Sequence, residues 1–194
     1  MTTIAVTDFV EFPSIARLSR EMIVTEKIDG TNAQVFVGED GAVRAGSRNR
    51  WIVPEADNFG FAGWVRDHAD ELRDGLGVGR HFGEWWGSGI QRGYGLPKGE
   101  KRFSLFNVSR WADDRDTVKY PNPRPACCHV VPVLRAGVFD TAVIESALTL
   151  LGTAGSVASP GFMQPEGIVV FHLAGNVGFK KTLDKNDGHK GAGR

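Results

Sequence analysis

Short stretches in which apolar and polar residues alternate fill the first part of the chain, and this period of two predicts strands. Residues 22–27 alternate in this way and end at a lysine. An Asp-Gly pair follows and predicts a turn into a return strand that begins over 33–37. The Glu-Asp-Gly run at 39–41 predicts a hairpin into a third strand through Ala45.

Two segments have the period of a helix instead. In residues 58–74 apolar side chains recur about one turn apart, and Asn58 is a candidate N-cap. The second segment is 141–151, with Asp140 as its cap and Gly152 as its stop.

Further strands are predicted in the remaining apolar stretches, at 80–85, 102–108, 129–134, 167–172 and 177–183. Strand hairpins combined with two helices indicate an α+β fold of largely antiparallel sheets flanked by helices. A chain of 194 residues is long enough for one domain with a core and too short for two ordinary domains.

The composition is that of a globular protein, with 41% hydrophobic and 24% charged residues. No apolar run approaches the roughly 18 residues needed to span a bilayer. The first residues lack the basic and apolar regions of a secretory signal, so we expect a cytoplasmic protein with no membrane partner. Cys127 and Cys128 are adjacent and are expected to be reduced. With His129 they would make poor tetrahedral metal geometry, so buried or loop thiols are the favoured interpretation.

The net charge is zero, from 23 Lys and Arg against 23 Asp and Glu. A nucleic-acid partner therefore requires a local basic surface. Three basic stretches are candidates, and scattered solvated charges are the alternative for each. The stretches are Arg44, Arg48 and Arg50; Arg92, Lys98, Lys101 and Arg102; and Lys180, Lys181, Lys185, Lys190 and Arg194.

Lys27 stands at the end of a predicted strand, immediately before a turn, where an amine can be held at a rigid edge. A free lysine has a pKa near ~10.4, and deprotonating it near neutral pH costs roughly 4 kcal/mol unless the site lowers that pKa. Nearby cations lower it, and Lys180 and Lys181 are candidates if the last strand lies beside Lys27.

The sequence Lys27-Ile28-Asp29-Gly30-Thr31-Asn32 resembles the nucleotide-binding motif of the covalent nucleotidyltransferases, which are RNA ligases, DNA ligases and mRNA capping enzymes. Further segments follow in that superfamily's order: Ser47-Arg48, Phe82-Gly83-Glu84 with Gly87-Ser88-Gly89-Ile90-Gln91, Phe103 to Val108, Glu166-Gly167 and Phe179-Lys180-Lys181. Together they are similar to the phage-type nick-joining RNA ligases over roughly residues 12 to 183. The Asp-Gly-Thr-Asn ending resembles RNA ligases more than DNA ligases.

The resemblance implies a role for each matching residue. Lys27 would attack the α-phosphate, and Asp29, Lys180 and Lys181 would assist catalysis. Asp29 and Glu166 would position the metal or the lysine. Nucleotide contacts are implied for Glu26, Lys27, Arg48, Glu84, Phe106, Glu166 and Lys180, with Glu84 on the ribose and Phe106 stacked on the base.

The chain departs from the family pattern in three segments. Asn107 stands where related enzymes often have aspartate, and Phe171 and His172 stand where several ligases have a lysine. Thr182 replaces the second lysine of a Lys-x-Lys pair, so the second phosphate contact is open.

The resemblance therefore implies an ATP-dependent RNA ligase that uses Mg²⁺ or Mn²⁺. Lys27 would take AMP from ATP and pass it to a 5′-phosphate, which a 3′-hydroxyl then attacks. RNA ends are the expected partner, with DNA or a substrate-binding partner protein as the other options. Residues 1–183 would be the adenylyltransferase domain and 184–194 a short mobile tail, with no OB-fold domain.

Two alternatives remain from other classes. One is a nucleotidyltransferase that uses GTP or joins DNA ends. The other is a nucleic-acid-binding relative that does not turn over, although a binding module has no need of the lysine nucleophile. A protein-modifying adenylyltransferase is a weaker third, since nothing in the sequence favours it.

Overall fold

The computed structural model describes residues 11–184. Its strands are β1 (Glu21–Lys27), β2 (Thr31–Val37), β3 (Val43–Ser47), β4 (Trp51–Ile52), β5 (Gly79–Gly87), β6 (Lys101–Leu105), β7 (Cys128–Val130), β8 (Val133–Val138), β9 (Gly167–His172) and β10 (Val177–Thr182). Its α-helices are α1 (Phe61–Asp67), α2 (Ala69–Leu76), α3 (Val108–Trp111) and α4 (Thr141–Ala154), with 3-10 turns at Pro54–Ala56 and Gly93–Gly95. No helix in this range combines the length and apolar character needed to cross a membrane.

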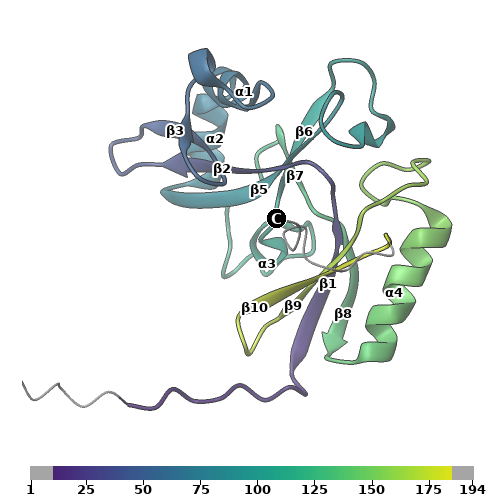
Figure 1. Ribbon diagram of the computed structural model, residues 1–194. Coiled ribbons are helices and arrows are strands. Elements are labelled where there is room, and N and C mark those ends of the chain that lie inside the picture. Colours follow the sequence, from purple (N-terminus) through teal and green to yellow (C-terminus); the bar gives the residue numbers. More distant parts are fainter. Residues whose placement is uncertain (1–10, 185–194) are drawn as a thin grey trace, which may run out of the picture.

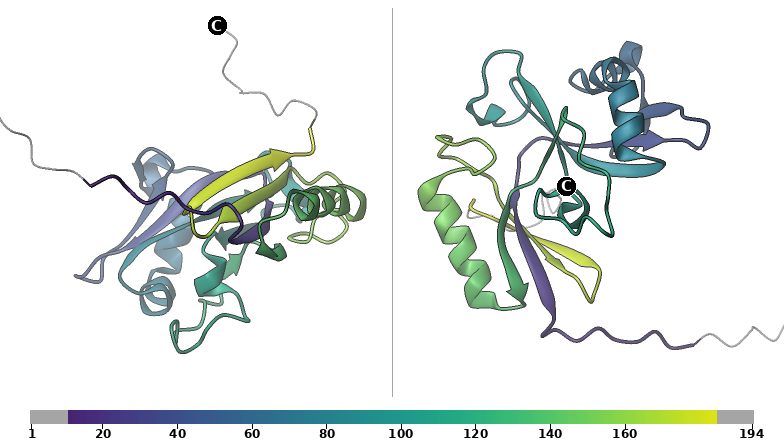
Figure 2. Two further views of the ribbon diagram at one scale, coloured as in Figure 1. Left: turned by 90° about the horizontal axis from the view of Figure 1, so that it is seen from below. Right: turned by 180° about the vertical axis from the view of Figure 1, so that it is seen from behind.

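The strands form two sheets, and the expected α+β class is confirmed. The four-stranded sheet has the order β10-β9-β1-β8, and the six-stranded sheet has the order β4-β3-β2-β5-β6-β7. All described pairings are antiparallel except the parallel pair β6 and β7. Helix α4 covers the four-stranded sheet, while α1 and α2 lie by the six-stranded sheet (Figures 1 and 2). The molecule is therefore two sheets with helices on the outer sides.

The predicted hairpin between residues 22–27 and 33–37 is wrong, because the chain passes from one sheet into the other (Figure 1). β1 pairs with β8 and β9, whereas β2 pairs with β3 and β5. The crossing runs so close to β5 that a Cβ on Gly30 would lie 2.5 Å from the Trp85 carbonyl oxygen. Only glycine fits such a close approach. Gly30 therefore lets the chain cross from one sheet to the other, instead of turning it back into a hairpin.

The helical segment predicted over 58–74 is divided into α1 and α2 at His68, and its cap is not Asn58. The Asp57 carboxylate accepts hydrogen bonds from the backbone N–H groups of Asn58, Ala62 and Gly63 at 2.6 to 3.0 Å, which satisfies the otherwise unpaired donors of the first turn. The Asn58 amide instead donates to Thr31 Oγ1 at 3.1 Å and ties the helix to β2.

Helix α4 begins as predicted, since the Asp140 carboxylate accepts from the Ala142 N–H at 2.7 Å. It continues past Gly152 to Ala154. The residue that ends it is Gly155, with φ of +86°, a conformation that favours glycine.

Two further strand predictions need correction. The strand predicted over 129–134 is two strands in different sheets, β7 and β8, separated at Val131 and Pro132. The strand predicted over 102–108 ends at Leu105. Asn107 then caps α3 by accepting from the Arg110 N–H at 3.2 Å, a local role that an aspartate would also fill.

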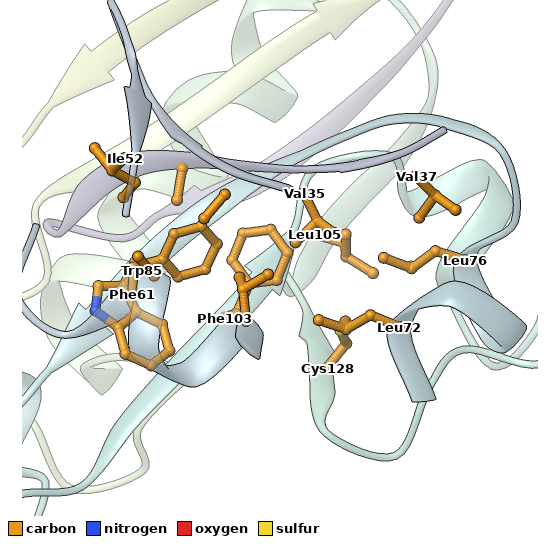
Figure 3. Packing of buried hydrophobic residues seen from close by; sticks show 14 of the residues in the cluster. Val35, Val37, Ile52, Phe61, Leu72, Leu76, Trp85, Phe103, Leu105 and Cys128 are labelled. Atoms are coloured by element: carbon orange, nitrogen blue, oxygen red, sulfur yellow. The ribbon is translucent and has the colours of Figure 1, made fainter. Parts of the chain in front are cut away.

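Three apolar clusters hold the layers together. The largest packs β2, β3, β5 and β6 against α1 and α2 (Figure 3), and the second packs β1 and β9 against α4. The third includes Ile28, Trp86 and Tyr94, which come from the crossing, from β5 and from the Gly93–Gly95 turn. It joins the two sheets next to the crossing at Gly30.

Candidate active site

A polar pocket of about 310 Å³ opens where β1 crosses into β2. It is lined by Lys27, Asp29, Gly30, Thr31, Asn32, Arg48 and Glu84. Four of the residues singled out from the sequence, Lys27, Asp29, Arg48 and Glu84, therefore meet in one cavity. They come from both sheets, so the pocket exists only because the crossing brings the sheets together.

The Lys27 amine points at a carboxylate from a distant part of the chain. Its Nζ lies 2.5 Å from Glu166 Oε2, with side chains 24% and 14% exposed. Glu166 precedes β9, whose first residue, Gly167, pairs with Lys27 across the sheet. The strand register therefore fixes this contact between groups 139 residues apart.

Glu84 projects from β5 toward the same pocket. Its carboxylate accepts hydrogen bonds from the Gly30 N–H at 3.2 Å and from Asn32 Nδ2 at 3.0 Å. Burial raises the pKa of Glu84 to about 7, although the positive charge of Lys27 acts in the opposite direction. This carboxyl is thus poised to change its protonation state near neutral pH.

Arg48 and Asp29 line the pocket and are each held in place by a different hydrogen-bonding partner. Arg48 reaches across to β2, donating from Nε and Nη2 to Asn32 Oδ1 at 3.0 and 2.7 Å. Asp29 Oδ2 accepts from Arg92 Nε at 3.0 Å. Arg92 also donates to the carbonyls of Gln164 and Pro165 and, at 2.6 Å, to Asp184. One arginine therefore ties the Asp29 loop to the segment that precedes Glu166.

The buried hydroxyl of Tyr94 links the three key positions of the pocket. It donates to the Lys27 carbonyl at 3.3 Å and accepts from the backbone N–H groups of Asp29 at 3.1 Å and Glu166 at 3.3 Å. Burial raises the pKa of Tyr94, so the hydroxyl keeps its proton. The sequence analysis missed this residue, and its only signal was a tyrosine set between two glycines, Gly93 and Gly95.

The two lysines of the last strand lie on opposite faces of their sheet, because side chains alternate along a strand. Lys180 is in register with Val169 and Thr25, on the face that Lys27 occupies. Lys181 faces α4 and pairs with Glu145, so the structure does not bring it to the pocket. Thr182, opposite Gly167, is in the cross-strand row of Lys27.

Glu26 is also kept away from the pocket by this alternation. It is 1% exposed and faces the opposite side of β1 from Lys27. Its carboxylate accepts from Ser156 Oγ at 2.6 Å and from the N–H groups of Val157 and Ala158 at 2.8 and 2.9 Å. The sequence prediction that Glu26 contacts the nucleotide gains no support from this position, where it anchors the loop after α4.

Phe106 does not line the pocket but lies on the same side of the six-stranded sheet. Its N–H donates to the Phe82 carbonyl at 3.0 Å, which continues the β5–β6 register past Leu105. Glu84 lies two residues along β5 from Phe82, so all three side chains share one face. Phe106 is 41% exposed, and it is available for stacking at the edge of the site.

In the second basic stretch, only Arg92 reaches the residues of the pocket, through its salt bridge with Asp29. The other described residues of that stretch and the two cysteines do not line the pocket. Arg102 pairs with Glu100. Cys128 is buried, and its Sγ lies 4.0 Å from that of Cys127, so both thiols are free. In the third stretch, Lys185, Lys190 and Arg194 lie outside the described residues.

The pocket carboxylates can contribute to a metal site only together with other ligands. Within residues 11–184 no group of three or more His, Cys, Asp or Glu side chains could hold a metal ion. Asp29 and Glu166 each already form a salt bridge with a basic side chain, Arg92 and Lys27 respectively. This donor set fits Mg²⁺ or Mn²⁺ that arrives with phosphate oxygens, since such ions are commonly held by one or two carboxylates plus substrate phosphate.

The fold is that of a nucleotidyltransferase domain of RNA ligases. The chain superimposes on Naegleria gruberi RNA ligase in a mutant form with AMP and Mn with a TM-score of 0.62, at 19% identity over 85% of this chain. A mutant with ATP and Mn gives 0.61 at 20% identity over 84%, and the form with pyrophosphate gives 0.60 at 20% over 84%. The chain spans about half the length of these structures, 49% to 50%.

The chain belongs to the RNA ligase family, whose model, described as RNA ligase, matches residues 20–182. This range contains every pocket residue and all of the described sheets. No curated protein matches the chain.

Glu84 should make the stability of the protein depend on pH. Because its pKa is raised to about 7 in the folded state, its contribution is fully present below the unfolded pKa and is lost as pH rises through about 7. From about pH 5 to about pH 8 we expect wild type to lose roughly 2 kcal/mol of unfolding free energy relative to Glu84→Gln. Urea denaturation of both proteins across this range measures the difference. Parallel curves would contradict the pKa assignment.

Proposed function

We propose that this protein is an ATP-dependent polynucleotide ligase that forms a lysyl-AMP intermediate on Lys27 and joins 3′-hydroxyl to 5′-phosphate ends of RNA. The observation that carries the proposal is the convergence of Lys27, Asp29, Arg48 and Glu84 on one pocket, with Glu166 against the lysine. Membership of the RNA ligase family supports the reaction class.

The proposed first step needs an uncharged amine in line with the α-phosphate. Glu166, 2.5 Å from Nζ, holds the amine at the pocket wall and is the nearest acceptor for its proton. Nζ then bonds to the α-phosphorus as the bond to pyrophosphate breaks. Lys180, on the same sheet face, and Arg48 supply positive charge for the phosphate oxygens.

The remaining residues have roles in nucleotide binding. Glu84 would accept hydrogen bonds from ribose hydroxyls, and Phe106 would stack on the base. Asp29 and Glu166 would hold Mg²⁺ or Mn²⁺, which supplies charge neutralisation on the phosphates. The Naegleria gruberi ligase structures that contain ATP or AMP with Mn support this choice of nucleotide and metal.

The direct test is the intact mass of the full chain after incubation with Mg²⁺ and either ATP or GTP. Pretreatment with pyrophosphate would remove nucleotide already carried. A gain of one AMP with ATP alone supports the proposal, and a gain of one GMP supports the GTP-using alternative. Persistent absence of an adduct with either metal would overturn it in favour of a binding relative.

The second half of the proposal, end joining, is tested separately. A nicked duplex and a single-stranded RNA, each with a labelled 5′-phosphate, are incubated with the adenylylated protein. Transfer of AMP to the 5′-phosphate followed by a longer product supports RNA joining. Matched DNA strands distinguish the DNA-end-joining alternative.

Tyr94→Phe should slow lysyl-AMP formation by roughly ten- to a hundredfold while ATP affinity changes little. Removing the hydroxyl leaves the Asp29 and Glu166 N–H groups without their acceptor, at about 1–3 kcal/mol each, and releases the Lys27 carbonyl. Tyr94 touches no reacting atom, so it is a positioning residue. Single-turnover rates and ATP binding measure the effect.

Tyr120→Phe is the matched control for that variant, because the chain has only two tyrosines. Tyr120 lies outside the pocket and is expected to leave the rate unchanged. Equal rates for both variants and wild type would remove the positioning role of Tyr94.

A further inference from the structure

The face of the six-stranded sheet that looks away from α1 and α2 continues beyond the pocket in two cross-strand rows. In the first row, Gln34 is opposite both Gly46 and Phe82, and Gly46 is opposite Trp51. In the second row, Phe36 is opposite both Arg44 and Arg80. We call Phe36, Trp51, Phe82, Arg44 and Arg80 the aromatic–arginine face.

Two aromatic rings of this face are open to solvent, and Phe36 is half-buried. Trp51 is 44% and Phe82 54% exposed, and Phe106 continues the row at 41%. The rings of Phe36 and Trp51 lie 5.8 Å apart, and the Arg80 guanidinium is 5.1 Å from each. Flat rings exposed in a row are unusual on a surface that carries no ligand, because burying them elsewhere would be favourable.

The arginines of this face are not neutralised by carboxylates. Among residues 11–184, Arg44, Arg48 and Arg80 form no salt bridge, and Arg48 and Arg80 donate instead to the neutral amides of Asn32 and Gln34. Arg66, Arg73, Arg92, Arg102 and Arg124 pair with acidic groups, whereas other described arginines, such as Arg50 and Arg135, do not. What distinguishes Arg44 and Arg80 is that both lie opposite Phe36 on one sheet face, next to Arg48 at the pocket. In a chain of zero net charge, this local excess favours an anionic partner.

The aromatic–arginine face is continuous with the pocket. Arg48 lines the pocket and bonds to Asn32, which is opposite Glu84 one row before Gln34. A strand whose end occupies the pocket therefore meets the exposed rings and free arginines next. Arginine forks suit phosphate oxygens, and exposed rings stack on bases without regard to sequence.

We infer that the aromatic–arginine face binds the single-stranded part of the polynucleotide next to its reactive end, with Trp51 and Phe82 stacking on bases and Arg44 and Arg80 contacting phosphates. This inference rests on the proposed function and adds to it a surface outside the nucleotide pocket. Of the first basic stretch of the sequence, it assigns Arg44 to substrate binding, beside Arg48 in the pocket.

The test is fluorescence anisotropy of a labelled, 5′-phosphorylated RNA of roughly 12 nucleotides with the full chain, a length within the range of single-strand sites. Trp51→Ala and Phe82→Ala should each weaken binding roughly five- to fiftyfold. Arg80→Ala should lower the slope of log affinity against log salt by about 0.7, the value for one phosphate contact on a single strand.

Matched controls lie elsewhere on the surface. Phe179→Ala removes an aromatic ring that is 57% exposed on β10, and Arg66→Ala removes an exposed arginine from α1, on the other side of the six-stranded sheet. Both should bind RNA like wild type. Thermal unfolding of every variant excludes loss of fold as the cause.

A second probe separates stacking from charge. An abasic strand of the same length and charge should bind wild type more weakly than the RNA, and Trp51→Ala and Phe82→Ala should each reduce that difference. Lysyl-AMP formation is measured on each variant in parallel. Weakened RNA binding with retained adduct formation supports the inference.

Unchanged RNA binding in all three variants, with the adduct formed, would overturn this surface and leave the proposed function standing. Failure of wild type to bind any oligonucleotide would also overturn it and assign the face to a protein partner. Absence of the adduct in wild type would instead count against the proposed function itself.

Discussion

Lys27→Ala should abolish the AMP adduct, lowering its formation by at least about a thousandfold, because no other group can replace an attacking amine. Among residues 11–184, Lys27 is the only amine lining the pocket, and its removal also leaves Glu166 without its salt-bridge partner. Intact mass after incubation with ATP and Mg²⁺ measures the result. A full adduct in the variant would refute Lys27 as the nucleophile.

Two control variants distinguish the role of Lys27 as a nucleophile from the effect of its positive charge. Lys27→Arg keeps a cation beside Glu166 but presents a group that stays protonated, so it should also form no adduct. Lys98→Ala removes an exposed lysine from the loop before β6 and should react like wild type. An adduct lost in Lys98→Ala as well would indicate general damage.

Glu26→Ala should be the most destabilising of the substitutions considered, by about 3–5 kcal/mol. It leaves the buried Ser156 hydroxyl and two backbone N–H groups without their charged acceptor, and hydrogen bonds to charged groups contribute about 1.5–3 kcal/mol each. For a chain of this size the melting temperature should fall by roughly 10 °C. Urea unfolding and thermal melts measure both quantities.

Glu21→Ala is the control, because Glu21 is exposed at the start of the same strand and should change stability by less than about 0.5 kcal/mol. Glu26→Gln keeps one acceptor oxygen, so its loss of stability should lie between those of Glu26→Ala and Glu21→Ala. A Glu26→Ala protein of unchanged stability but weakened ATP binding would contradict the anchoring role and restore the nucleotide contact predicted from the sequence.

The period of two in the sequence located the strands well but did not assign them to sheets. Residues 22–27 and 33–37 are strands, yet they separate at Gly30 because each finds its partners later in the chain. Pro132 likewise lies in the break between two strands that look continuous in sequence. Pairing between distant segments is a property of the whole fold, which a local pattern does not contain.

The motif order gave the candidate site residues, which stay a prediction, while the alternation of faces decides which of them meet. Lys27 and Glu84 reach the pocket, whereas Glu26 and Lys181 are one residue out of phase with it and turn toward the opposite face. Tyr94 could not be found by motif, because its role depends on hydrogen bonds between its hydroxyl and three backbone groups that are distant in sequence.

The pairing of β1 with β9 also bears on how the protein is made. β1 is synthesised early, but its neighbour in the sheet and the carboxylate that meets Lys27 come about 140 residues later, at Gly167 and Glu166. A growing chain on the ribosome can therefore complete the six-stranded sheet, from residues 31–130, before the second sheet can close. Contacts of such long sequence separation form slowly. The protein should thus acquire a folded half first, and Lys27 should meet Glu166 only at the end of folding.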